Sequence, residues 1–268
     1  MKQRTITAVV AALIFIPIIV SGGWFFKLFV YVIASIALLE LVRMKKISRY
    51  SVASGLGLLL MWALMFPYKD LAEYGIVTEN LITKSEITLL AVLVLLSYTV
   101  LVKNRFTFDD AGFLLISTIY IGMGFHYLIE TRVAEQGLKY LFFALFVVWA
   151  TDTGAYLFGR ALGKHKLWPQ ISPKKTIEGS VGGIVLACVV AIIFQLVAPL
   201  SHSMLIVLLV TILVSIAGQI GDLVESAFKR HYAVKDSGKI LPGHGGVLDR
   251  FDSLIFILPI LHLINFIS

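Results

Sequence analysis

The sequence predicts an all-α, polytopic integral membrane protein with about nine transmembrane helices. Of its 268 residues, 59% are hydrophobic and 15% are charged, whereas a soluble globular domain is about 45–50% apolar and about 25% charged. The apolar residues form continuous runs rather than the alternating pattern of a membrane β-barrel. With one cysteine and so few charges, the composition excludes a disordered chain, a secreted disulfide-stabilised domain and an ordinary cytosolic enzyme.

Nine apolar segments are candidates for spans, since a helix crosses the bilayer core with about 20 residues. The first follows Lys2 and Arg4, as a signal peptide would, but no A-x-A cleavage site comes after it, so we expect it to be retained. The first, third and fourth segments are short. The segments are Thr5–Val20, Trp24–Val42, Val52–Pro67, Ile87–Val102, Ala111–Ile129, Leu138–Phe158, Gly179–Leu200, Met204–Leu223 and Phe251–Ile267.

We expect residues 1–268 to form one membrane domain, with a five-helix part over residues 1–137. Residues 138–268 then supply the catalytic helices and two cytoplasmic loops, 159–178 and 224–250.

The basic residues predict the orientation of these spans. Eighteen of the 23 Lys and Arg residues fall at the amino terminus or in even-numbered connections. Because cytoplasmic loops carry the excess of Lys and Arg, this bias predicts a cytoplasmic amino terminus and, with nine spans, a carboxyl terminus outside. The same bias explains the net charge of +7 without a nucleic-acid partner. The five basic residues on the other side are Lys27, Lys69, Lys84, Arg132 and Lys139.

The connection after the sixth span has the features of a phosphate site. Ser172 followed by Pro173 is typical of a helix N-cap with proline at the first helical position. A helix starting there would direct free backbone N–H groups, Lys174 and Lys175 at one anion, with Glu178 placed to orient either ammonium group. The alternative is a basic juxtamembrane loop that holds anionic lipid headgroups.

Asp152 interrupts the sixth span, within the sequence WATDTGAY. An ionisable residue inside a membrane span is a candidate functional residue by default. The alternative is an aspartate that pairs with a lysine of a neighbouring loop.

Carboxylates also gather where the eighth and ninth spans meet the cytoplasm. If the eighth helix continues past its apolar run, Asp222, Glu225, Ser226 and Lys229 share one face. Asp249 and Asp252 share a face of the next helix, after a loop whose glycines allow close backbone approach to a ligand.

Oxygen ligands beside a phosphate site favour Mg²⁺ over Zn²⁺. The pattern therefore predicts metal-assisted phosphoryl or nucleotidyl transfer, and the membrane setting predicts a lipid substrate.

Residues Ser226 to Asp252 read SAFKRHYAVKDSGKILPGHGGVLDRFD. This stretch resembles the signature of the phosphatidate cytidylyltransferase (CDP-diacylglycerol synthase) family: a serine, K-R, K-D, H-G-G and D-R-x-D, with no departure inside it. The stretches around Asp152 and from Ser172 to Gly179 also look like that family.

The resemblance implies an enzyme that converts CTP and phosphatidate into CDP-diacylglycerol and diphosphate in phospholipid biosynthesis. It implies Mg²⁺ as cofactor, with a second metal or a monovalent cation as a further option, and a homodimer in a bacterial-type inner or cell membrane with the active site facing the cytoplasm. We expect direct attack of a phosphatidate oxygen on the CTP α-phosphorus, because no Ser–His or Cys–His nucleophile pair is evident.

Site residues are carried over from the family motifs. The implied catalytic residues are Asp222, Asp249, Lys175, Lys229 and Arg230. The implied metal ligands are Asp222, Asp249 and Asp252. The implied substrate-binding residues are Lys174, Thr176, Ser172, Ser226, His244, Gly245, Gly246, Arg250, Asp152 and Glu178.

Two alternatives belong to other functional classes. A CDP-alcohol phosphotransferase would carry a D-G-x-x-A-R motif, which the sequence lacks. A transporter of an anionic lipid or nucleotide would place its binding charges near the bilayer midplane, whereas these charges lie at the cytoplasmic ends of the spans.

Overall fold

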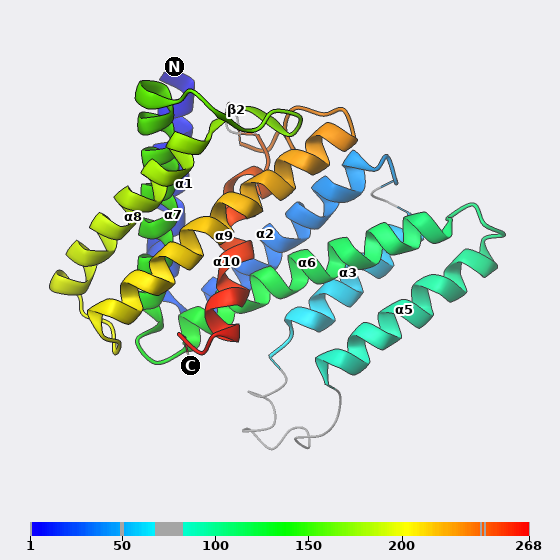
Figure 1. Cartoon of the computed structure of the whole chain (residues 1–268). Coiled ribbons are helices and arrows are strands. Elements are labelled where there is room, and N and C mark those ends of the chain that lie inside the picture. Colours follow the sequence, from blue (N-terminus) through cyan, green and yellow to red (C-terminus); the bar gives the residue numbers. More distant parts are fainter. Residues whose placement is uncertain (1, 49–50, 68–82, 242, 244, 268) are drawn as a thin grey trace. The chain divides into compact units, whose positions relative to one another are not determined.

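The computed structural model of the chain describes residues 2–48, 51–67, 83–241, 243 and 245–267, and for residues 2–6, 8, 9, 11 and 12 it describes the backbone alone. Within them the chain is helical apart from one short hairpin (Figure 1). The elements are α1 (Lys2–Ser21), α2 (Gly23–Met44), α3 (Val52–Met65), α5 (Lys84–Leu101), α6 (Phe108–Val133), α7 (Gly137–Leu162), β1 (Lys166–Trp168), β2 (Ser172–Thr176), α8 (Ile177–Val197), α9 (Met204–His231) and α10 (Leu248–Leu263).

Each apolar segment that the sequence predicts as a span coincides with one of these helices. Six of the described helices (α2, α5, α6, α7, α8 and α9) are long and apolar enough to cross a membrane. The helices α3 and α10 are shorter, with 14 and 16 residues. An all-α integral membrane protein is thus supported, while the count of nine crossings and the orientation of the termini stay predictions.

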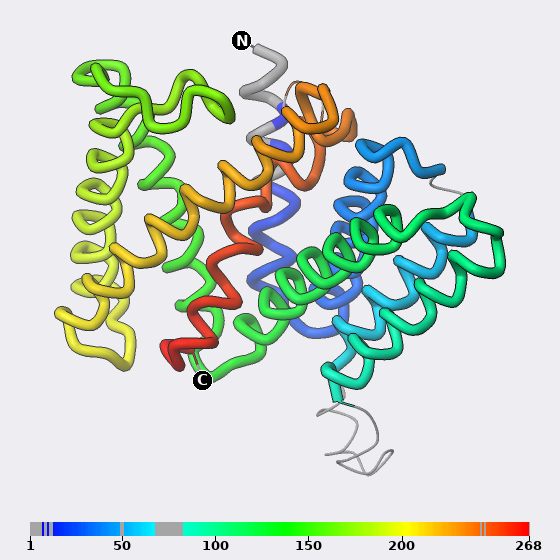
Figure 2. Tube along the Cα trace, turned by 45° about the vertical axis from the view of Figure 1, so that its right-hand side comes forward, coloured from blue at the N-terminus to red at the C-terminus, as the bar shows by residue number. Residues whose placement is uncertain are grey.

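The backbone packs as two compact units. Unit 1 contains residues 1–26 and 127–268, and unit 2 contains residues 27–126. In unit 1, α7 and α8 lie side by side (Figures 1 and 2) because small residues let their backbones meet. A Cβ atom at Gly154 would lie 2.8 Å from the carbonyl oxygen of Gly182, and one at Gly183 would lie 2.7 Å from that of Thr151. These glycines therefore serve close packing of the two helices.

Polar contacts tie further helices into unit 1. The Thr151 and Ser215 hydroxyls, on α7 and α9, lie 2.8 Å apart in a buried position. The Ser253 hydroxyl on α10 donates to the carbonyl oxygen of Gly218 on α9 at 3.0 Å. These bonds fix α9 against both α7 and α10, so the carboxyl-terminal half of α9 has a defined position for its polar face.

Unit 2 packs α3 against its neighbouring helices. The Trp62 indole N–H donates to the Ser35 hydroxyl of α2 at 2.9 Å. Gly57 leaves room for Leu114 of α6, since a Cβ atom there would lie 2.8 Å from a Leu114 methyl group. Leu38, Met61 and Leu114 are fully or almost fully buried and form part of the core of this unit.

The segment after α7 differs from the prediction. Ser172 does not cap a helix: Ser172–Thr176 is strand β2, which pairs antiparallel with β1 through Lys166–Thr176 and Trp168–Ser172. The helix starts one turn later, because the Thr176 hydroxyl accepts the backbone N–H of Gly179 at 3.1 Å and caps α8. The lysines therefore lie on a strand instead of at a helix N-terminus.

Candidate active site

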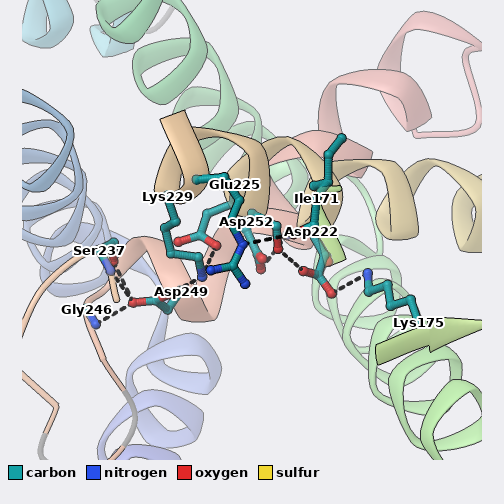
Figure 3. Close-up of polar contacts among 12 residues, drawn as sticks. Ile171, Lys175, Asp222, Glu225, Lys229, Ser237, Gly246, Asp249 and Asp252 are labelled. Atoms are coloured by element: carbon teal, nitrogen blue, oxygen red, sulfur yellow. Dashed lines mark hydrogen bonds and ion pairs between the residues drawn. The ribbon is translucent and has the colours of Figure 1, made fainter. Parts of the chain in front are cut away.

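The last three turns of α9 carry a polar face, as the spacing predicts. The helix continues without a break to His231, so helical spacing places Asp222, Glu225, Ser226 and Lys229 along one side. Figure 3 shows Asp222, Glu225 and Lys229 on this side of the helix. The Ser226 hydroxyl donates to Asp222 Oδ1 at 3.4 Å. The Lys229 ammonium group forms an ion pair with the carboxylate of Glu225, whose side chain is 1% exposed. These are the side chains that α9 contributes to the candidate site.

Asp249 organises the loop between α9 and α10. Its Oδ1 accepts from Lys229 Nζ at 2.7 Å. Its Oδ2 accepts from the Ser237 backbone N–H at 2.8 Å, the Ser237 hydroxyl at 2.7 Å and the Gly246 N–H at 2.8 Å. We call Asp249 and its partners Lys229, Ser237 and Gly246 the Asp249 junction (Figure 3).

The Asp249 carboxylate is ionised at neutral pH by this environment. Burial, with 5% of the side chain exposed, would by itself raise its pKa. The hydrogen bonds from Lys229, from the Gly246 N–H and from Ser237 outweigh burial, and they hold the pKa of Asp249 well below its usual range. A charged, fully bonded carboxylate thus joins α9, the loop and α10.

Gly245 is required by the same junction. Its φ is +85°, in the left-handed region, and a Cβ atom there would lie 2.4 Å from Asp249 Oδ2. A side chain at this position would collide with the carboxylate as well as strain the backbone. The glycine in the sequence H-G-G thus allows the loop to close over Asp249.

A second cluster joins α9 to the hairpin. Lys175 Nζ lies 2.6 Å from Asp222 Oδ2, with 25% and 33% of the two side chains exposed. Asp152 on α7 and Asp252 on α10 both lie within electrostatic range of Asp222. We call Asp222 with its partners Lys175 and Ser226 the Asp222 junction; it places one cation and one carboxylate in a partly exposed position, with Asp152 and Asp252 nearby.

Two further contacts hold the hairpin in position. Arg230 Nε donates to the carbonyl oxygen of Ile171 at 3.1 Å (Figure 3). The Glu178 carboxylate accepts from His165 Nδ1 at 2.6 Å and from the backbone N–H groups of Lys164 and His165 at 3.1–3.2 Å. The prediction that Glu178 orients Lys174 or Lys175 is wrong: the hairpin turns the lysines away, and Glu178 instead fixes the start of the hairpin.

Other candidate residues lie apart from these contacts. Lys174 is exposed. Asp152 and Arg250 are exposed as well, and neither forms an ion pair within the described residues. Asp152 lies within electrostatic range of Lys175 and Arg250, so the alternative of an Asp152–lysine pair stays open. His244 lies outside the described residues.

Three residues with clear structural roles were not among the predicted site residues. Glu225 was placed on the polar face of α9, but its burial against Lys229 depends on the packing of α10 and the loop. Ser237 supplies two of the hydrogen-bond donors to Asp249. In the sequence, the only indication of this role was its position between Asp236 and Gly238. His165 contacts Glu178 across 13 residues, which no local pattern indicates.

The donor set of the Asp222 junction is compatible with Mg²⁺. Mg²⁺ prefers carboxylate and phosphate oxygens and is usually held by one or two carboxylates together with substrate phosphates. Within the described residues no three acidic, histidine or cysteine side chains are assembled as a complete metal site. Asp222 has a partly exposed carboxylate, whereas both oxygens of Asp249 already accept hydrogen bonds.

Comparison with known proteins identifies the family of this chain. Residues 2–268 match the cytidylyltransferase family. The phosphatidate cytidylyltransferase of Bacillus subtilis strain 168 is 54% identical over 263 residues, which cover 98% of this chain and 96% of the relative. Those of Staphylococcus epidermidis and Staphylococcus aureus are 51% and 47% identical, and the match covers 98% of both chains in each case. The chain therefore belongs to the cytidylyltransferase family.

Proposed function

We propose that this protein is a phosphatidate cytidylyltransferase, which converts CTP and phosphatidate into CDP-diacylglycerol and diphosphate. The observation that carries the proposal is full-length similarity, near 50% identity, to relatives with that name. The paired junctions around Asp222 and Asp249 support it, because cations and carboxylates meet at the ends of membrane helices, where a lipid phosphate and a soluble nucleotide can meet.

The reaction needs little covalent work from the protein. An oxygen of the phosphatidate phosphate attacks the α-phosphorus of CTP, a new P–O bond forms, and the bond from the α-phosphorus to the bridging oxygen breaks as diphosphate leaves. The attacking oxygen is already anionic at neutral pH, so the step requires no strong general base. The demand on the protein is to position two anions and to offset their charge.

We assign to the basic residues of the site the role of positioning the two anionic substrates and offsetting their charge. Lys175 lies on the hairpin, Arg230 contacts the hairpin, and Lys229 lies in the Asp249 junction. Lys175, Lys229 and Arg230, with Lys174, would hold the phosphates of CTP or phosphatidate. Ser172, Thr176, Ser226, Asp152, Glu178, His244, Gly245, Gly246 and Arg250 remain the proposed substrate-binding set.

We also propose that Asp222 holds Mg²⁺, with Asp249 and Asp252 as further ligands. When bound, Mg²⁺ would neutralise charge on the triphosphate and on the leaving diphosphate. The chain's own contribution is to hold the Asp222 carboxylate in place through its contacts with Lys175 and Ser226.

A direct assay tests the proposal. The full chain, purified in detergent and supplied with phosphatidate and labelled CTP, should form CDP-diacylglycerol with Mg²⁺ and lose this activity in EDTA. Diacylglycerol in place of phosphatidate should give no product, because it lacks the attacking phosphate. Absence of CDP-diacylglycerol with active lipid substrate, or a trapped covalent nucleotidyl-enzyme, would overturn the activity or the direct mechanism respectively.

We propose in addition that the site faces the cytoplasm and that the protein works as a homodimer. The single cysteine, Cys188, allows a clean test of orientation. In a Cys188→Ser background, Lys239→Cys should react with an impermeant maleimide only after the cell membrane is opened, whereas Lys139→Cys should react in intact cells. The mass of the purified chain in detergent, measured by light scattering, tests the dimer.

A further inference from the structure

Unit 2 contains a cavity of about 800 Å³ at the ends of α2 and α5 and the starts of α3 and α6. This volume lies within the range of about 300–1,000 Å³ typical of ligand pockets. Among the residues that the structure describes, four basic side chains line the cavity, together with one carboxylate, Asp110. The basic residues are Lys45, Lys46, Lys103 and Arg105.

The positive charge of this cavity is largely uncompensated. Lys45 Nζ lies 3.5 Å from Asp110 Oδ1 and 5.8 Å from the centre of the Phe113 ring. Asp110 itself caps α6, since its Oδ2 accepts the Thr107 N–H at 3.0 Å and the Thr107 hydroxyl at 2.9 Å. The remaining three basic side chains, Lys46, Lys103 and Arg105, are exposed and form no ion pair with any residue that the structure describes.

The backbone presents two of these lysines in an uncommon conformation. Lys46 and Lys103 have φ values of +63° and +54°, at the ends of α2 and α5. Helices usually place glycine or asparagine at such a left-handed position, because a larger side chain is strained there. Each turn is held by a backbone bond, Lys46 N–H to Arg43 O and Lys103 N–H to Val100 O, both at 3.0 Å. Two equivalent turns thus direct lysines at one cavity.

The cavity also has an apolar side. Tyr98, Leu101, Val102 and Phe106 line it beside the basic residues. Leu101 is 79% exposed, and α5 is a candidate membrane span of which 22% is buried. A ligand that fills this site therefore meets both cations and apolar side chains of a candidate membrane span.

We propose that this cavity binds a phosphate-bearing anion, with the headgroup of an anionic phospholipid as its natural source. Basic pockets between transmembrane helices bind such headgroups through charge, and the apolar side of the cavity suits the attached acyl chains. All of these residues belong to unit 2, whereas the candidate active-site residues belong to unit 1. The inference stands independently of the proposed reaction.

The test compares two variants of the full chain that remove the same charge. The first is Lys46→Gln/Lys103→Gln/Arg105→Gln. The control is Arg160→Gln/Lys164→Gln/Lys239→Gln, which replaces three exposed basic residues outside the cavity. Native mass spectrometry of the detergent-purified proteins would count bound phosphatidylglycerol, with phosphatidylcholine as the uncharged comparison. A second arm measures binding of inorganic phosphate by calorimetry.

We expect the cavity variant to bind phosphatidylglycerol at least about tenfold more weakly than wild type, since each basic residue contributes to the attraction of anionic lipid. The control variant and phosphatidylcholine binding should stay near wild type. A photoactivatable phosphatidylglycerol should label residues 98–106 in wild type and not in the cavity variant.

If inorganic phosphate binding alone falls in the cavity variant, the anion site stands and its source is soluble. Unchanged binding in both arms, or equal losses in the cavity and control variants, would overturn the proposal. Because cytidylyl transfer is not the readout, failure of the proposed reaction would leave this test unaffected.

Discussion

The Asp249 junction and the Asp222 junction use the same residue types in opposite ways. Asp249 is 5% exposed and accepts four hydrogen bonds from a lysine, a serine and a glycine. Asp222 is 33% exposed, faces one lysine, and has a long 3.4 Å bond from Ser226. Asp249 is therefore buried among four donors, while Asp222 is more exposed and contacts only two, which leaves it more capacity for a ligand. The difference suggests that Asp249 shapes the site and that Asp222 contacts what enters it.

Asp249→Asn should have the largest effect, because it affects both structure and activity. The amide of asparagine cannot accept all four hydrogen bonds. Lys229 would also lose the charge of Asp249 and keep only Glu225 as an ion-pair partner. We expect the free energy of unfolding to fall by about 3 kcal/mol and the rate of CDP-diacylglycerol formation to fall at least about 100-fold. Thermal unfolding in detergent and the cytidylyl-transfer assay measure the two effects. Wild-type stability in this variant would contradict the structural role of the junction.

Asp222→Asn should reduce activity without a comparable loss of stability. A partly exposed ion pair contributes about 0–1 kcal/mol, so the melting temperature should change little. Loss of a carboxylate that meets the ligand should lower the rate about 100-fold. Asp109→Asn, at an exposed acid of unit 2, is the matched control and should keep both properties. Equal loss of stability in Asp222→Asn and Asp249→Asn would remove the distinction between the junctions.

Gly245→Ala tests the closure of the loop over Asp249. The added Cβ atom would meet Asp249 Oδ2 at 2.4 Å and take a φ of +85°. We expect a loss of about 1–3 kcal/mol in stability and a smaller drop in rate than for Asp249→Asn. Gly112→Ala is the control, since nothing lies within 4 Å of its Cβ position in α6. Its stability should be unchanged or higher by about 0.5–1 kcal/mol. The interpretation fails if both alanine variants behave alike.

The smallest effect concerns pH. The folded-state pKa of Asp249 is lowered, so its contribution to stability is fully present above the unfolded value of about 3.9 and is lost only as the pH falls further. The difference in unfolding free energy between wild type and Asp249→Asn should therefore be constant from about pH 8 to about pH 5 and shrink below about pH 4. Chemical denaturation across this range measures it. A difference that shrinks near pH 6 would show that the carboxylate is not held ionised.

The continuous apolar runs were enough to predict the helices. A transmembrane helix needs apolar side chains along its whole length, whether they face lipid or the protein interior. The polar face of α9 was predictable for the same reason, since helical spacing places Asp222 and Lys229 on one side. The hairpin was not predictable: Ser172-Pro173 has local features of a helix start, and the pairing of Trp168 with Ser172 overrides them. The partner of Lys175 lies 47 residues away, and the partner of Glu178 is His165, just before β1, so local spacing assigned the wrong contact.

The length of α9 has a consequence for the size of ligand that the site can accept. Asp222 and Lys229 are seven residues apart on one unbroken helix, which separates their backbones by about 10 Å along the axis. Their side chains are held in place by Lys175 at one end and by Glu225 and Asp249 at the other. One phosphate group is too short to touch both positions, whereas a chain of linked phosphates can. If Asp222 and Lys229 both contact the substrate, as proposed, this backbone separation would favour a chain of linked phosphates over a single phosphate group.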